Sequence, residues 1–178
     1  MAKTYRIHEI PQLADRSVLF DANVLIYNFW PSGNQAWEAV YSRAFGQLLH
    51  QGNPLYVSLT ILSEVINRAL RLEYNNYLQR TSRGQHTFPF KKYRDSSDGQ
   101  QMLSDIYDIV RDTILLHFTM VDQCLSNAET ISLLTPGTLD FNDAYIVKLC
   151  QDHSLVLLTN DSDFKNAGLD LLSSNHGL

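Results

Sequence analysis

Cysteine is scarce in this sequence, which contains only Cys124 and Cys150. The two residues form no CxxC pair, and domains stabilised by disulfides carry many more cysteines. Each lies in an apolar context with helical spacing, so we expect both to be buried thiols. The cysteine content therefore argues against a disulfide framework and favours a reducing compartment.

Long apolar runs are missing as well. No stretch approaches the ~20 apolar residues that a transmembrane helix requires. The first residues, MAKTYRIHEIPQ, lack the apolar segment of a secretory signal peptide. We therefore expect a cytoplasmic protein with no membrane partner.

Positive charge is in short supply. The 14 lysines and arginines stand against 19 aspartates and glutamates, which gives a formal net charge of −5. This balance does not suit a protein that coats nucleic acid by charge alone. It is compatible with a nuclease, in which acidic residues gather in the site and basic residues act locally.

Two common kinds of catalytic motif are also missing. No glycine-rich GxGxxG or Walker-type loop is present, so the sequence gives a nucleotide cofactor no support. The histidines show no paired spacing of the kind that zinc sites use. They are His8, His50, His86, His117, His153 and His176.

The sequence does contain an alternation of short apolar runs and amphipathic segments. Continuous apolar runs indicate strands buried on both faces, as in a parallel sheet covered by helices. The runs are 18–21, 55–58, 117–121, 155–159 and 169–172, and the segments of helical period are 35–50, 59–71, 98–116 and 140–151. This order predicts one α/β domain over residues 1–178, a three-layer α/β/α sandwich with a mainly parallel sheet of four or five strands.

Residues 75–99 interrupt this alternation. The stretch is polar, contains one proline and two glycines, and shows no sustained period. We therefore expect an insertion or long loop between two helices.

Acidic residues recur at the carboxyl ends of the expected strands, where open α/β sheets bind ligands. Asp21 closes the first strand, Glu64 lies on the helix after the second, Asp143 begins a later helix, and Asp161 and Asp163 follow the run 155–159. Carboxylates that share a site either take up protons or bind a cation. All-oxygen ligands suit Mg²⁺ or Mn²⁺, which can polarise a phosphodiester and activate water.

Each of these acids also has an ordinary structural explanation. Asp21 can cap the turn that follows it, and Glu64 can pair with Arg68 one helical turn later. Asp140 and Asp143 have the spacing of an N-cap and the third helical residue, and for Asp140 we expect the capping role. The two acids after the run 155–159 can likewise cap a short turn. Taken jointly, the acids favour a metal site over four separate caps.

Four stretches, in this order, resemble the PIN domain, a metal-dependent ribonuclease fold found in bacterial VapC-type toxins and in RNA-processing and RNA-decay factors. They are VLFDANVLIY (18–27), SLTILSEVINRAL (58–70), LDFNDAYIVKLCQDHSLVLLTNDSDF (139–164) and the run 169–172. The most specific parts are D-x-N after the first strand, and D-A-x-I-V before a strand that ends in T-N-D-x-D-F. The resemblance implies an α/β/α fold with a parallel sheet.

The resemblance also implies residue roles. Four acids match those that hold one or two Mg²⁺ or Mn²⁺ ions and carry the catalysis: Asp21, Glu64, Asp143 and Asp161. At the fourth position Asp163 competes with Asp161 as a metal ligand. Asn23 matches a polar residue that buttresses the site, and Thr159 matches a hydroxyl residue that hydrogen-bonds an acid.

The implied activity is that of a metal-dependent endoribonuclease, with VapC-like toxins as one kind. The implied partners are an RNA substrate, an antitoxin protein and a second copy of the chain in a homodimer. A PIN-like module that has lost turnover and binds RNA or protein is the alternative. A phosphoryl-accepting receiver or a phosphatase is less well supported, because residues 21–23 hold no second acid and residues 157–161 hold no lysine.

Residues 75–99 contain the main basic cluster of the chain. Its cations can contact nucleic-acid phosphates, and its aromatic residues can stack on unpaired bases. A solvated loop whose aromatic residues pack back onto the core, or a docking surface for an antitoxin or a second subunit, are the alternatives. The predicted nucleic-acid-binding residues are Arg80, Arg83, Lys91, Lys92 and Arg94, and the interleaved aromatic residues are Tyr77, Phe88, Phe90 and Tyr93.

Overall fold

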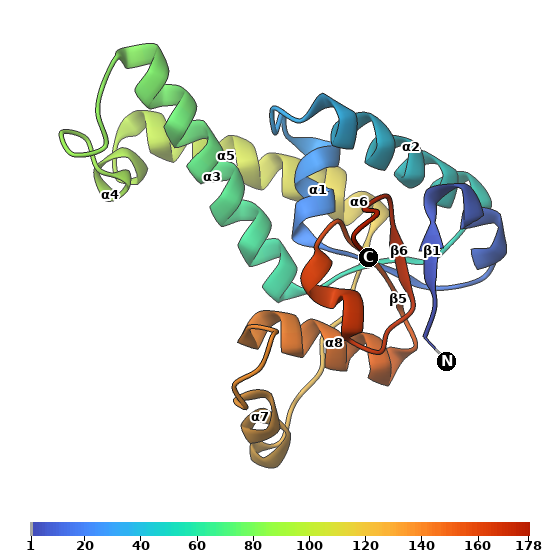
Figure 1. The fold of residues 1–178 in the computed structure, drawn as a ribbon. Helices are drawn as coiled ribbons and strands as arrows, with labels where there is room; N and C mark the ends of the chain where they lie inside the picture. The colour runs from blue at the N-terminus through green and yellow to red at the C-terminus, as the bar shows by residue number, and fades with distance from the viewer. Residues whose placement is uncertain (1) are drawn as a thin grey trace.

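A computed structural model describes residues 2–178 (Figure 1). The strands are β1 Thr4–Arg6, β2 Val18–Phe20, β3 Leu55–Val57, β4 Thr119–Met120, β5 Val156–Leu158 and β6 Leu171–Ser173. The α-helices are α1 Ala22–Phe29, α2 Gln35–Gln51, α3 Leu59–Thr81, α4 Phe90–Arg94, α5 Ser97–Ile109, α6 Leu115–His117, α7 Asn127–Leu133 and α8 Phe141–His153. Two 3₁₀ helices, η1 Ile7–Leu13 and η3 Ser162–Asn166, and a π-helical turn, η2 Val110–Ile114, complete the described chain.

The six strands form one sheet in the order β1-β6-β5-β2-β3-β4, and every neighbouring pair is parallel. The predicted α/β class and parallel sheet are confirmed. The predicted count of four or five strands is wrong, because β1 pairs with β6 although Thr4–Arg6 is only partly buried and contains no apolar run. The strand expected over 117–121 shrinks to Thr119–Met120, since the chain remains helical through His117.

Helices cover both faces of the sheet. Because parallel crossovers are right-handed, the connections from β2 to β3 and from β3 to β4 lie on one face. These connections carry α1, α2, α3 and α5, and α1 packs against both α2 and α3. The crossover from β4 back to β5 carries α8 onto the opposite face, and Figure 1 shows α8 across the strands from α1 and α2. The result is the expected α/β/α arrangement.

The centre of the sheet is fully buried. Every residue of β2 and β5 is buried, which explains why these strands read as continuous apolar runs instead of alternating ones. Phe20 packs edge-on against Phe45 and Phe118, at ring-centroid distances of 5.9 and 4.9 Å. The core therefore fixes the strand that ends at Asp21.

Residues 75–99 are mostly helical, and residues 82–89 are their longest stretch outside a helix. They are therefore not one long loop, while the other form of the expectation, an insertion, stays a prediction. Helix α3 continues to Thr81, and α4 and the start of α5 fold back against it. Tyr74, Tyr77 and Leu78 continue the buried face of α3, and Phe88 and Tyr93 close over them. Figure 1 shows this arm, residues 72–105, projecting away from the sheet. Of the alternatives for the cluster, packing of its aromatic residues is the one found for Tyr77, Phe88 and Tyr93.

The two cysteines differ in environment. Cys150 is buried in α8, and burial raises the pKa of its thiol to about 12. Cys124 is exposed, so the prediction that it is buried is wrong. Cys124 belongs to residues 121–126, which form no helix or strand and therefore present no buried face. Across residues 2–178, no helix has the length and apolar character needed to cross a membrane.

Candidate active site

Asp21 stands at the point where the strand order of the sheet reverses. It follows β2, which lies between β5 and β3, and it is the N-cap of α1. The register pairs Phe20 with Leu158, which places Thr159 beside Asp21 on the neighbouring strand end. Ligands of open α/β sheets bind at such a reversal, beyond the carboxyl ends of the strands.

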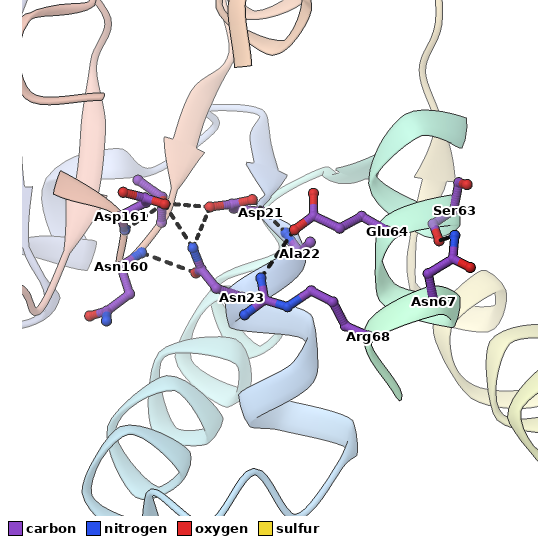
Figure 2. A network of polar contacts seen from close by, with 10 residues as sticks. Asp21, Ala22, Asn23, Ser63, Glu64, Asn67, Arg68, Asn160 and Asp161 are labelled. Atoms are coloured by element: carbon purple, nitrogen blue, oxygen red, sulfur yellow. Dashed lines mark hydrogen bonds and ion pairs between the residues drawn. The ribbon is translucent and has the colours of Figure 1, made fainter. Parts of the chain in front are cut away.

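The Asp21 carboxylate is buried and held by three donors. One oxygen accepts the backbone N–H of Ala22 at 2.6 Å. The other accepts the side-chain amide of Asn23 at 2.5 Å (Figure 2) and the hydroxyl of Thr159 at 2.6 Å. Asp21 is thus a helix cap, which is one of the two expected explanations. Asn23 and Thr159, the residues predicted to support the site, both donate hydrogen bonds to its carboxylate.

Burial raises the pKa of Asp21 to about 6. The hydrogen bond from Thr159 opposes this shift, while the negative charges of Glu64 and Asp161 add to it. A carboxylate so placed gains from a cation that replaces the missing solvation. The charge of Asp21 is therefore poorly compensated by the surrounding protein alone.

Glu64 lies on α3, about two turns after the end of β3. Its carboxylate accepts a hydrogen bond from Arg68 at 3.1 Å, so the expected ordinary helix pair is present. Both side chains are substantially exposed, at 38% for Glu64 and 47% for Arg68, and exposed pairs of this kind contribute little to stability. Figure 2 shows Glu64 reaching from α3 toward Asp21. Because the pair with Arg68 is weak, Glu64 can leave Arg68 for another partner at small cost in free energy.

Asp143 lies in the first turn of α8, where Asp140 is the N-cap. The side chain of Asp140 accepts the backbone N–H of Asp143 at 2.9 Å, which confirms the predicted capping role. Desolvation raises the pKa of Asp143 to about 7, and the charges of Asp140, Asp21, Asp161 and Glu64 push it in the same direction. Asp143 therefore lies within electrostatic reach of the other acids.

The remaining two acids follow β5. Asp161 caps η3 by accepting the backbone N–H of Asp163 at 3.0 Å, and its own N–H donates to the Thr159 hydroxyl at 2.9 Å. Its charge acts on both Asp21 and Asp143. Asp163 lines the same cleft, but its charge is not among the leading causes of either shift.

An open cleft of about 770 Å³ between α3 and the start of α8, here called the acidic cleft, is lined by Glu64, Asp140, Asp143, Asp161 and Asp163. Asp21 is buried and is not among the lining residues. Its donor set is made of oxygen ligands, which fits a hard divalent cation. Within residues 2–178, however, no three His, Cys, Asp or Glu side chains are grouped so that they could hold a metal ion as they stand. In this arrangement Glu64 faces Arg68, and both Asp21 oxygens accept hydrogen bonds. Binding a metal would therefore require side-chain rotations, above all of Glu64.

Two supporting residues were not anticipated. The hydroxyl of Tyr41 donates to Asn160 Oδ1 at 2.8 Å, and the backbone N–H of Asn160 donates to Asn23 Oδ1 at 3.1 Å. Together they hold the segment that leads to Asp161. The T-N-D motif pointed to Asn160, but Tyr41 gave no signal, since it lies on an amphipathic helix 118 residues before Thr159.

The predicted nucleic-acid-binding residues lie on the arm, and none of them lines the acidic cleft. Arg83 stacks on Phe88 and Tyr77, Lys92 lies over Phe88, and Arg94 pairs with Asp95. Lys91 is exposed. Arg80 lies near Tyr77 and lines a small pocket with several acids. The structure thus gathers these cations on one projection, separate from the cleft.

The chain belongs to the PIN domain family. The family model described as PIN domain matches residues 18–169, which include Asp21, Glu64, Asp143 and Asp161. No curated protein sequence matches the chain.

Among solved structures, the chain is similar to FitAcB from Neisseria gonorrhoeae, with a TM-score of 0.52 and 17% sequence identity. The alignment covers 87% of this chain and 96% of that chain. The structure of VapBC2 from Rickettsia felis, bound to a DNA fragment from the VapBC2 promoter, is also similar, with a TM-score of 0.49 and 18% sequence identity. That alignment covers 88% of this chain and 98% of that chain. At this identity the FitAcB likeness shows a shared fold.

Proposed function

We propose that this protein is a divalent-metal-dependent endoribonuclease and the toxin of a toxin–antitoxin pair. The observation that carries the proposal is the placement of a buried carboxylate, Asp21, at the centre of the sheet, with three further acids, all lining the acidic cleft, within electrostatic reach of it. The pKa values of Asp21 and Asp143 are raised because the surrounding protein leaves this negative charge uncompensated. The chain belongs to a family whose members are generally nucleases, which supports phosphodiester hydrolysis as the reaction at this site.

Asp21, Glu64, Asp143 and Asp161 would hold one or two Mg²⁺ or Mn²⁺ ions, with Asp163 as a rival to Asp161. The ions would supply an activated water and would stabilise the charge that develops on the scissile phosphate. The residues of the chain orient this chemistry. Asn23 and Thr159 keep the Asp21 carboxylate in one orientation, and no side chain is required as a covalent nucleophile.

The proposed partners are an RNA substrate, an antitoxin protein and a second copy of the chain. They rest on the resemblance to VapC-type toxins, and the shared fold with FitAcB is in keeping with them. The cations of the arm, Arg80, Arg83, Lys91, Lys92 and Arg94, are proposed to contact RNA phosphates. Lys91 is the cleanest member to test, because it is exposed and forms no ion pair among residues 2–178.

The test is the substitution Asp21→Asn. It keeps the size of the side chain and its capping oxygen but removes the charge. Cleavage of RNA in Mn²⁺ should fall by at least about 100-fold, more than the loss expected for a residue that only supports a ligand. Asp105→Asn, an equally conservative change at an exposed position of α5, should leave cleavage unchanged.

A specific observation favours the alternative of a catalytically silent binding module. Glu64 is engaged with Arg68, and the acids among residues 2–178 are not grouped to hold a metal as they stand. If purified wild-type protein binds RNA but cleaves none of several RNAs in Mn²⁺, the binding module is the better description. Cleavage that persists unchanged in Asp21→Asn would instead refute the proposed site.

A further inference from the structure

The acidic cleft continues along α3 into two further recesses. The first, here called the base recess, has a volume of about 380 Å³ and is lined by residues that include Tyr27, Asn34, Arg68, Arg71 and Asn75. The second, here called the arm recess, has about 460 Å³ and lies against the arm. Arg71 lines all three spaces, and Arg68 lines the cleft and the base recess. The three spaces therefore adjoin at Arg71, and together they are here called the track.

The charge along this track changes sign. Five acids line the cleft, but no aspartate or glutamate of residues 2–178 lines the base recess or the arm recess. Arg71 is exposed, and its guanidinium lies 4.5 Å from the centre of the Phe90 ring. Among residues 2–178 no carboxylate is within ion-pair distance of it. A cation held on an aromatic ring and lacking a carboxylate partner is well placed to bind a phosphate.

The base recess has the chemistry of a nucleobase site. Tyr27, Ile26 and Leu72 give it apolar and aromatic walls. Asn34 and Asn75 add polar groups: Asn34 caps α2 through its oxygen, which leaves its NH₂ group available, and Asn75 forms no side-chain hydrogen bond among residues 2–178. Aromatic walls with free amides suit the face and the edge of an unpaired base. A paired base cannot leave its helix to enter such a recess without unstacking.

We infer that the base recess receives a base of an unpaired RNA strand next to the phosphate that occupies the acidic cleft, and that Arg71 contacts the backbone between them. This inference rests on the proposed function and deepens it, because it gives the substrate a base-binding recess and a path past Arg71. It also separates two groups of cations. Arg71 contacts RNA at the entrance to the cleft, whereas the cations of the arm lie beyond it.

The closing experiment compares Asn75→Asp with Asn76→Asp. The two substitutions add the same charge at adjacent positions of α3, but Asn75 lines both recesses and Asn76 lines neither. Binding of a short fluorescent single-stranded RNA is measured by anisotropy in the Asp21→Asn background with Mg²⁺ present, so that cleavage does not interfere. Asn75→Asp should weaken binding by about 10-fold, since a like charge meets the strand. Asn76→Asp, whose added charge lies beside Arg80 on the arm, should weaken it clearly less.

A second comparison uses Arg71→Ala. Its control is Arg43→Ala, which removes an exposed arginine of α2. Loss of one phosphate contact should lower the slope of log Kd against log salt by about 0.7 for Arg71→Ala and leave it unchanged for Arg43→Ala. A duplex RNA of the same sequence should compete poorly with the single strand. Circular dichroism and thermal unfolding confirm that each variant is folded.

Equal effects of the two aspartate substitutions, or an unchanged salt slope in Arg71→Ala, would overturn the inference. Equal competition by the duplex would overturn the claim of an unpaired base. Each of these readouts is a binding measurement, so it is independent of turnover. A wild-type protein that binds as expected and cleaves nothing would contradict the proposed nuclease function while supporting the track.

Discussion

The hydroxyl of Thr159 joins two acids of the site. It donates to the buried Asp21 carboxylate at 2.6 Å and accepts the backbone N–H of Asp161 at 2.9 Å. Thr159→Val keeps the shape of the side chain but removes one of the three donors to Asp21 and leaves the N–H of Asp161 without its acceptor, which should reduce the free energy of unfolding by about 1–3 kcal/mol. RNA cleavage should fall by about 10- to 100-fold, as for other residues that orient a metal ligand.

Thr159→Ser is the matched control for this prediction because it retains the hydroxyl. We expect it to preserve most of the cleavage activity measured in Mn²⁺ and most of the stability measured by urea unfolding. If the serine and valine variants lose activity equally, the hydroxyl does not orient Asp21, and the role of Thr159 is packing alone.

The two acids after β5 can be separated at the same scale. Asp161 is among the leading causes of the raised pKa values of Asp21 and Asp143, whereas Asp163 is not a leading cause of either. We therefore expect Asp161→Asn to lower RNA cleavage by at least about 10-fold more than Asp163→Asn. The comparison is made on cleavage rates over a range of Mn²⁺ concentrations. A larger loss in Asp163→Asn would reverse the assignment of the fourth acid.

Part of the site could be predicted because its parts are close in sequence or follow strands. Asp21 and Asn23 are two residues apart, and the strand end at Thr159 marks the position beside them. Arg71 could not be predicted in the same way. Its importance comes from the direction in which α3 continues past the cleft, and that direction depends on packing between α3, α1 and α5.

The arm depends on one close approach between elements. Gly99 lies in the first turn of α5, where a Cβ would collide with the backbone carbonyl of Tyr93. Because backbone cannot move aside as a flexible side chain does, Gly99→Ala should lower the free energy of unfolding by about 1–3 kcal/mol. Hydrogen exchange should show the loss of protection concentrated in α4 and the start of α5.

Gly46→Ala gives the contrasting case on α2. No atom lies within 4 Å of a Cβ built at Gly46, so the substitution adds helix propensity and should stabilise the protein by up to about 1 kcal/mol. Both variants are compared by urea unfolding. A Gly99→Ala protein as stable as wild type would show that α4 and α5 can separate without cost.

The arm and strand β1 show why some elements escaped prediction. Val18–Phe20 and Val156–Leu158 are apolar throughout, because both faces of the sheet are covered there, and they were easily recognised. Strand β1 lies at an edge and is partly exposed, so it carries no such run. In the arm, Tyr74 and Tyr77 continue the face of α3, but they pack on Phe88 and Tyr93 from a separate segment. The hydrophobic period of one segment does not reveal a buried face that is covered by residues of another segment.

At the scale of the whole molecule, the acidic cleft makes stability depend on pH. The pKa of Asp21 is raised from 3.8 to about 6 and that of Asp143 from 3.8 to about 7. Above pH 3.8, and up to about pH 6 for Asp21 and about pH 7 for Asp143, the native protein keeps protons that the unfolded chain has lost. Its free energy of unfolding therefore falls as the pH rises through this range. For the fully buried Asp21 the loss is at most about 3 kcal/mol. Asp143 is only partly buried, and solvent screening reduces its effect on stability.

We therefore expect metal-free protein to be more stable at pH 5 than at pH 7.5, and Asp21→Asn to flatten this dependence. Histidines titrate in the same range, so the informative quantity is the difference between wild type and Asp21→Asn in urea unfolding at each pH. Asp105→Asn should follow the wild-type curve. A difference between wild type and Asp21→Asn that does not change with pH would show that Asp21 is ionised in the native protein throughout.

Divalent metal should reverse the pH effect, because it binds the ionised carboxylates of the native state and not the unfolded chain. At a Mn²⁺ concentration 100 times the Kd, the gain would be about 2.7 kcal/mol at pH 7.5. At pH 5 protons compete for Asp21 and Asp143, so the gain should be much smaller. Thermal unfolding of wild type and Asp21→Asn with and without Mn²⁺ measures this directly. Equal stabilisation at the two pH values, or equal stabilisation of the two proteins, would place the bound metal outside the acidic cleft.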